Sequence, residues 1–105
     1  MLLPLVVSLA IAVALTQVAT FSTINGLCHS RGYRTFDNTA TNIRWLALVT
    51  GGEGFHNNHH GFPRNPKFSV SSGEIDPSWP IIQLLTRMKL ARPYRTSVAT
   101  GQSPL

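Results

Sequence analysis

The sequence predicts an all-α chain in which one transmembrane helix is followed by short cytoplasmic or interfacial helices. Two observations lead to this prediction. From Met1 to Cys28 there is no Asp, Glu, Lys, Arg or His, and all nine basic and four acidic residues of the 105-residue chain come later. Beyond Cys28, short apolar segments alternate with loops rich in Gly, Pro and Ser. The single cysteine gives no sign of a disulfide-bonded scaffold.

The apolar segment Leu2–Ile24 has the length and composition of a membrane span. It consists mostly of Leu, Val, Ile and Ala, and about 20 such residues cross a hydrocarbon core of about 30 Å. A secretory signal peptide would place basic residues before a shorter apolar core, and a buried helix of a soluble protein is a further alternative. We predict that residues 1–30 form a transmembrane helix.

The charges after this segment predict its orientation. Arg31, Arg34 and Arg44 follow it, whereas no basic residue precedes it. Because positive residues favour the cytoplasmic side, we expect the C-terminal side, with all four histidines, to face the cytoplasm. The net charge of +5 suits a flank close to anionic lipid. The basic residues form no dense stripe, so we expect no nucleic-acid partner.

Two short helices are expected in the middle of the chain. Residues 42–49 are apolar and contain Trp45, which favours a helix at the membrane interface. A second helix is expected over about 53–60, since Thr50 and Glu53 have the spacing of a capping box.

A last helix is expected from about residue 77 or 79 to residue 91, where apolar residues recur at helical spacing beside basic ones. Residues 31–91 would thus form a cytoplasmic C-terminal part, and residues 92–105 a disordered tail.

Three of the four histidines, His56, His59 and His60 (the histidine triplet), fall within five residues. On a helix they would share one face, and neutral imidazole is the commonest nitrogen ligand of metals. The H-E-x-x-H frame of zinc proteases is absent because Asn57 follows the first histidine. Glu53 would either hold the tautomer of a ligand ring or cap the helix.

A chance surface cluster is the alternative to a metal site. Against it, the fourth histidine, His29, lies at the predicted mouth of the span, four residues after Asn25 and on the same helical face. These residues predict a membrane-associated polyhistidine metal site, with the metal and the reaction left open.

Three segments resemble a known family. N-G-L-C-H-S-R-G-Y-R (25–34), G-G-E-G-F-H-N-N-H-H-G-F-P (51–63) and E-I-D-P-S-W (74–79) are similar to the C-terminal part of membrane fatty acid desaturases of the stearoyl-type acyl-CoA and acyl-lipid branch. The resemblance extends from about residue 20 to residue 91.

The resemblance implies a cytoplasm-facing di-iron site that uses O2 to introduce a double bond into a fatty acyl chain, carried as acyl-CoA or acyl lipid. Electrons would come from cytochrome b5, ferredoxin or a similar donor. By position, the histidine triplet corresponds to the third histidine box of the family and His29 to an additional metal ligand after the last span. Asn25 corresponds to an asparagine that contacts a metal through water. Glu53 would contact a ligand side chain rather than the metal itself.

The chain also departs from the family pattern. Desaturases of this type have four spans and two earlier boxes, H-x-x-x-x-H and H-x-x-H-H, and neither box is in this sequence. We therefore expect a fragment of a four-span desaturase, its C-terminal third, which is inactive without an N-terminal portion. Two alternatives stay open: a single-span membrane peptide with a weak, non-catalytic histidine metal site, and a related di-iron lipid hydroxylase or sphingolipid desaturase.

Overall fold

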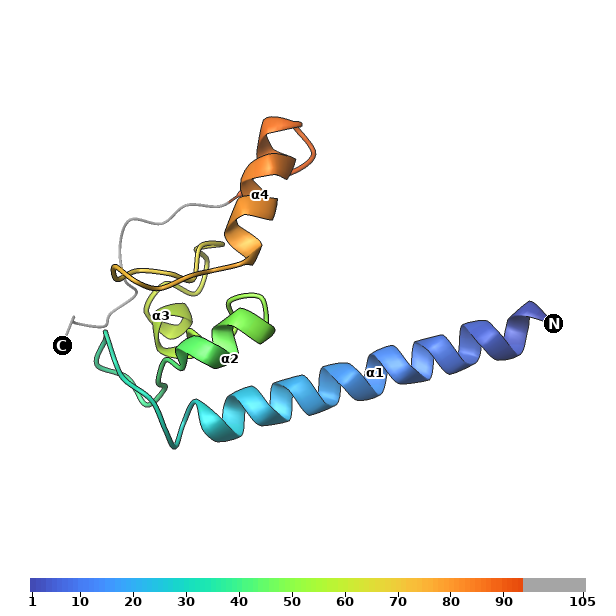
Figure 1. Cartoon of the computed structure of the whole chain (residues 1–105), viewed down its shortest axis with the longest axis horizontal. Helices are drawn as coiled ribbons and strands as arrows, with labels where there is room; N and C mark the ends of the chain where they lie inside the picture. Colours follow the sequence, from blue (N-terminus) through green and yellow to red (C-terminus); the bar gives the residue numbers. More distant parts are fainter. Residues whose placement is uncertain (94–105) are drawn as a thin grey trace.

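The long apolar helix α1, Leu2–Leu27, dominates the shape of the chain (Figure 1). The structure is a computed structural model, and it describes residues 1–93. At 1.5 Å per residue, α1 is roughly 39 Å long. Its side chains are exposed over most of its length, and Ile24 near its end is buried. Within the described residues, α1 is the one helix long and apolar enough to cross a membrane.

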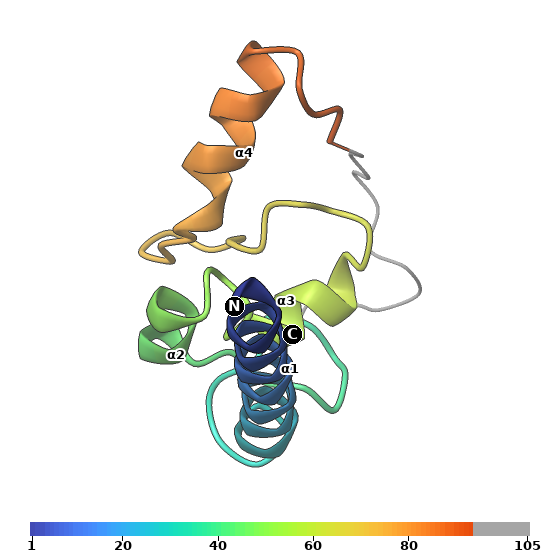
Figure 2. The ribbon, with the colours of Figure 1, turned by 90° about the vertical axis from the view of Figure 1, so that its right-hand side faces the viewer.

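Three shorter helices follow: α2, Arg44–Val49; α3, His56–Gly61; and α4, Ser78–Arg87. Between residues 1 and 93 there are no strands, and isolated bridges join Asn42 to Tyr33 and to Phe55. The predicted all-α class, with one long apolar helix and short helices after it, is confirmed. In Figure 1, α2 and α3 lie between α1 and α4, and Figure 2, a view along α1, shows α2 and α3 on opposite sides of that helix.

The ends of α1 and α4 fall short of the predictions. α1 ends at Leu27 rather than at residue 30, and the chain turns at Cys28. α4 ends at Arg87 rather than at residue 91, and Lys89 then adopts a φ of 60°, which is outside the helical region. The predicted tail, 92–105, lies outside the described residues beyond Pro93.

The predicted capping box before α3 is wrong. α3 begins at His56 and has no side-chain cap, because Gly51 and Gly52 have φ values of 66° and 99°. Those values suit glycine and exclude a right-handed helix. The hydroxyl of Thr50 instead donates to the carbonyl of Leu46 (2.6 Å) and accepts from the amide of Gly54 (3.1 Å), so it serves the C-terminal end of α2.

A small core joins the end of α1 to α2. Ile24, Cys28 and Leu46 are buried together, and partly buried Leu27 and Ile43 pack against them. Burial of such side chains supplies the main driving force for folding. This core holds the turn after α1 against α2. A short loop, residues 50–55, then connects α2 to α3.

Candidate metal centre

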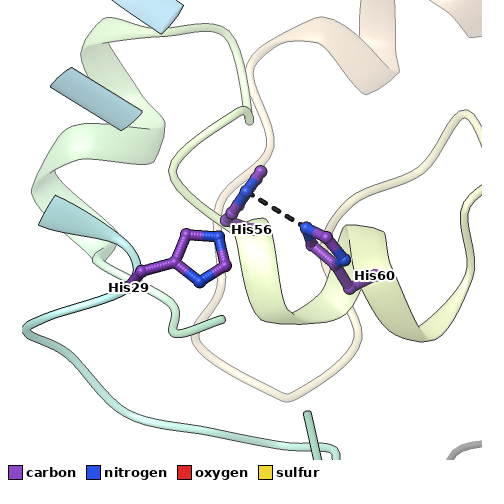
Figure 3. Close-up of side chains that lie close together, drawn as sticks. All are labelled: His29, His56 and His60. Atoms are coloured by element: carbon purple, nitrogen blue, oxygen red, sulfur yellow. Dashed lines mark hydrogen bonds between the residues drawn. The ribbon is translucent and has the colours of Figure 1, made fainter. Parts of the chain in front are cut away.

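Three histidines from two distant segments converge. His29 lies in the turn that follows α1, while His56 and His60 lie one turn apart on α3. Their potential ligand atoms all lie within 4.8 Å of one another, and the Nε2 atoms of His56 and His60 are 3.2 Å apart. Figure 3 shows the three rings facing a common point.

His59 lies beside this group but outside it. Its ring centroid is 6.1 Å from that of His56 and 5.9 Å from that of His60. The ring also packs edge-on against Phe68, with 5.4 Å between centroids. The histidine triplet therefore does not act as one unit here: two of its members join His29, and the third faces a different neighbour.

Two of the ring nitrogens are buried without a partner. Among the described residues, no hydrogen bond reaches Nδ1 of His56 or Nδ1 of His59. Leaving a buried polar atom unpaired is costly, and each such atom calls for an explanation. A metal bound directly at such a nitrogen would provide one.

The environment of His56 and His60 favours their neutral form. Burial is the main cause that lowers the pKa of His56 to about 4, and the neighbouring histidine rings add to it. Burial also lowers the pKa of His60, again with a contribution from the nearby rings. Because only neutral imidazole has a lone pair to give to a metal, this environment favours coordination at neutral pH.

The orientation of His29 is set by a backbone carbonyl. Its Nδ1 lies 3.2 Å from the carbonyl oxygen of Thr39. A carbonyl only accepts, so this hydrogen bond requires Nδ1 to carry the proton and leaves the lone pair on Nε2. Ligand histidines in metal sites commonly donate their second ring nitrogen in this way.

Asn57 lies between the histidines on α3 and is completely buried. Its Oδ1 accepts from the amides of Thr35 (2.7 Å) and Phe36 (2.8 Å). Its Nδ2 lies 2.9 Å from each of three acceptors, the carbonyls of Phe36 and Ala40 and Oδ1 of Asn38. This one side chain therefore ties α3 to the loop between His29 and α2.

Asn58 does the same on another side of α3. It exchanges two hydrogen bonds with the side chain of Asn42, at 2.8 and 3.1 Å. Its Nδ2 also donates to the carbonyl of Phe68 (2.9 Å) and to Oε2 of Glu74 (2.8 Å). Sequence reasoning missed both asparagines. The available signal was two adjacent Asn residues inside a short helix, where Asn is otherwise disfavoured.

Asn25 and Glu53 lie outside the histidine group. Asn25 is exposed on the last turn of α1, and Glu53 is half-buried in the loop before α3. Between residues 1 and 93, neither side chain makes a hydrogen bond to a histidine. Their expected roles, a contact to a metal through water and support of a ligand ring, stay predictions.

The donor set fits a first-row transition metal. Three imidazoles whose ligand atoms lie within 4.8 Å of one another can converge on one ion, and imidazole suits zinc, copper, iron and nickel. The buried, unpaired Nδ1 of His56 agrees with this use. The fold and the site therefore define the class as a protein with a helix long and apolar enough to cross a membrane and, near the end of that helix, a histidine cluster that could hold a metal ion.

Comparison with known proteins gives the family. The chain is 44% identical over 80 residues to an sn-2 palmitoyl-lipid 9-desaturase from Nostoc sp. (strain 36), an alignment that covers 74% of this chain. It is 40% identical over 70 residues, 65% of this chain, to an sn-1 stearoyl-lipid 9-desaturase from Anabaena variabilis. A Delta-9 acyl-lipid desaturase 1 from Arabidopsis thaliana is also 40% identical over 70 residues, again 65% of the chain. The chain belongs to the fatty acid desaturase family.

The chain spans about a quarter of the relatives it matches: 28% of the Nostoc protein, 26% of the Anabaena protein and 23% of the Arabidopsis protein. No family model matches it, and no solved structure matches it significantly.

Proposed function

We propose that this chain is the C-terminal part of an O2-dependent di-iron fatty acyl desaturase and supplies part of its metal site. The observation that carries the proposal is the convergence of His29, His56 and His60 at the end of a helix suited to a membrane. Relatives that are 36–44% identical to the chain are named as fatty acid desaturases.

The residues present would supply only part of a two-metal site. His29, His56 and His60 would hold one iron together, and His59 would contribute to the pair from the same short helix. The sequence contains four histidines in all, so further ligands would come from the portion of a desaturase that this chain does not span. When bound, the iron pair supplies the oxidising power that removes two hydrogens from an unactivated acyl chain.

The chain's own contribution is to hold neutral ligands in place. The low pKa of His56 keeps its ring neutral, and the Thr39 carbonyl selects one tautomer of His29. Asn57 and Asn58 fix α3 from two sides. A ligand set that is rigid before the metal arrives loses little entropy on binding.

The same proposal includes the substrate, the side of the membrane that the histidines face and the electron donor. The relatives' names specify both acyl lipids and acyl-CoA as carriers, so the substrate is a fatty acyl chain on one of these. The basic residues after α1 favour the cytoplasmic side for the histidines. There a small redox protein such as cytochrome b5 or a ferredoxin would deliver electrons.

A chimera tests the proposal. The matching segment of the Nostoc desaturase is replaced by this chain, the protein is expressed in bacteria with a suitable electron donor, and the acyl products are analysed by gas chromatography. We expect monounsaturated acyl chains. The same chimera with His56→Ala is expected to lose product, and the chain expressed alone is expected to make none.

The controls separate the possible outcomes. A chimera with Ser72→Ala, a change at an exposed loop residue, should keep its activity. A hydroxylated product would replace the desaturase proposal with a related hydroxylase. If the chimera reaches the membrane at the parental level and yields no product, the chain does not carry a working desaturase segment.

A further inference from the structure

The loop between α1 and α2 contains the carbonyl that orients His29. His29 itself lies in the turn after α1, and its ring reaches Thr39 through the 3.2 Å contact between Nδ1 and the carbonyl oxygen. Thr39 is exposed, so its own side chain does not hold this peptide by burial. The position of the carbonyl must come from the residues on each side.

Those residues are held by Asn57. Its Nδ2, with two hydrogens, lies at hydrogen-bond distance, 2.9 Å, from three acceptors: the carbonyls of Phe36 and Ala40 and Oδ1 of Asn38. Oδ1 of Asn38 also accepts from the amide of Ala40 at 2.9 Å. The peptide of Thr39 is therefore bracketed by atoms bonded to Asn57.

Burial strengthens this link. Asn57 is 0% exposed, Ala40 is 1% exposed and Phe36 is 4% exposed, so water cannot replace these hydrogen bonds. Losing the amide would leave several buried carbonyl and amide groups unpaired. Asn57 also follows His56 directly in the chain, so the same helix carries two histidines of the group and the anchor for the loop of the third.

We propose that Asn57 is a positioning residue of the metal site, which fixes the Phe36–Ala40 loop and thereby holds His29 with its proton on Nδ1 and its Nε2 toward His56 and His60. The inference deepens the proposed function, since it rests on the histidine group binding a metal. According to this inference, the first Asn of the H-N-N-H-H segment, Asn57, connects that segment to His29.

Asn58 provides a matched control. It is as deeply buried as Asn57, with 1% exposure. Among the described residues its side chain makes three hydrogen bonds, against five for the side chain of Asn57. The partners of Asn58 are Asn42, Phe68 and Glu74, and none of these belongs to the Phe36–Ala40 loop. Asn58→Ala should therefore remove buried hydrogen bonds that hold α3 without releasing the Thr39 carbonyl.

The test uses the full chain in detergent micelles, labelled with nitrogen-15 in its histidines. Long-range nitrogen–proton spectra at about pH 8, above the ordinary histidine pKa, report which ring nitrogen carries the proton. We expect His29 of the metal-free wild type to be protonated on Nδ1. Asn57→Ala should turn this into a mixture of tautomers, while Asn58→Ala should leave it unchanged.

Cobalt(II) binding, followed by its visible absorption, gives a second measurement. Loss of a partner that orients a ligand costs about 10- to 100-fold in metal affinity, and we expect Asn57→Ala to fall in that range. In a His29→Ala background, Asn57→Ala should cost nothing further, because the two residues act through one interaction.

Three results would overturn the inference. One is a wild-type His29 with its proton on Nε2, which needs no variant to fold. Another is a tautomer that does not respond to Asn57→Ala. The third is an affinity loss that adds in full to that of His29→Ala, which would mean general loosening of the fold. If the wild type binds no cobalt, the metal proposal fails, and the tautomer measurement still decides the role of Asn57.

Discussion

Tyr33 shows how a single residue connects separate parts of the polar network. Its hydroxyl donates to Oε1 of Glu74 at 2.6 Å, and the guanidinium of Arg44 lies 4.8 Å from its ring centroid. The other oxygen of Glu74 accepts from Asn58 and from the amides of Val70 and Ser71. The segment after α1, the helix α3 and the 68–74 loop thus all form hydrogen bonds with the carboxylate of Glu74.

The ionisation of Tyr33 gives a test by alkaline titration. Burial raises the pKa of Tyr33, and the hydrogen bond to Glu74 raises it further. Because the protonated form is favoured in the folded state, its contribution to stability is present below the ordinary tyrosine pKa of about 10 and is lost as the pH rises above it.

We therefore expect the ultraviolet phenolate signal to contain a tyrosine that ionises well above the ordinary pKa, together with unfolding. Tyr33→Phe should remove this late phase. A late phase of unchanged size in Tyr33→Phe would contradict the prediction.

Gly54 lies where two backbone segments approach closely. A Cβ at this position would come 2.7 Å from Cα of Ala47 and from the carbonyl carbon of Leu46, and closer still to the amide nitrogen of Ala47. The backbone of α2 cannot move aside as a flexible side chain could. We expect Gly54→Ala to lower the free energy of unfolding by about 3 kcal/mol.

Urea titration followed by tryptophan fluorescence measures this loss. Gly26 is the matched control: a Cβ there would meet nothing within 4 Å, and Gly26→Ala in α1 should be neutral or favourable by up to about 1 kcal/mol. Equal effects of the two substitutions would show that the close approach at Gly54 does not exist.

At the scale of elements, α1 and α3 are stabilised in different ways. α1 exposes its apolar side chains around its whole circumference, which needs an apolar surrounding such as a membrane. α3 has six residues, too few to be stable alone in water, and the hydrogen bonds of its two asparagines hold it in place.

The membrane requirement of α1 can be tested by charge insertion. An arginine at the centre of a span costs about 2.5–3.5 kcal/mol, so the double substitution Leu9→Arg and Val13→Arg should release the chain from membranes on alkaline carbonate extraction. Ser72→Arg, at an exposed loop position, should leave the chain in the membrane fraction. Retention of the double variant would show that α1 is not a span.

At the scale of the whole molecule, the histidine group depends on bringing residue 29 to α3. A site made by the helix alone would use only the histidine triplet. The structure instead groups His29 with His56 and His60 and leaves His59 against Phe68. The affinity of the folded chain for a metal should therefore depend on the tertiary contacts that place His29, as well as on α3.

Metal titration of the full chain distinguishes the two kinds of site. We expect His29→Ala to weaken cobalt(II) binding as much as His60→Ala does, roughly 10-fold or more, because each removes one of three ligands. His59→Ala should have a smaller effect. Isothermal titration calorimetry in micelles provides the affinities; if His29→Ala left binding unchanged, the site would be local to α3.

Local patterns were enough to predict much of the fold. Apolar length predicted α1, the apolar segment around Trp45 predicted α2, and the four histidines were recognised as a possible metal site. The capping box failed because Thr50 and Glu53 have the right spacing while Gly51 and Gly52 adopt φ values of 66° and 99°. The spacing between Thr50 and Glu53 does not reveal which backbone conformation the two glycines between them adopt.

By itself, the sequence determined that the chain is helical, that its first helix is long and apolar enough for a membrane, and that it resembles the desaturases. The first two properties follow from composition and short-range order, and the resemblance follows from the segments 25–34, 51–63 and 74–79. Only the tertiary structure decided that His29 joins two members of the triplet, that His59 stands apart, and that Asn57 and Asn58 hold α3. The physical reason is that ligand geometry and buried hydrogen bonds depend on contacts between residues 10 to 31 positions apart, such as Asn58 with Phe68 and His29 with His60, and local spacing cannot specify them.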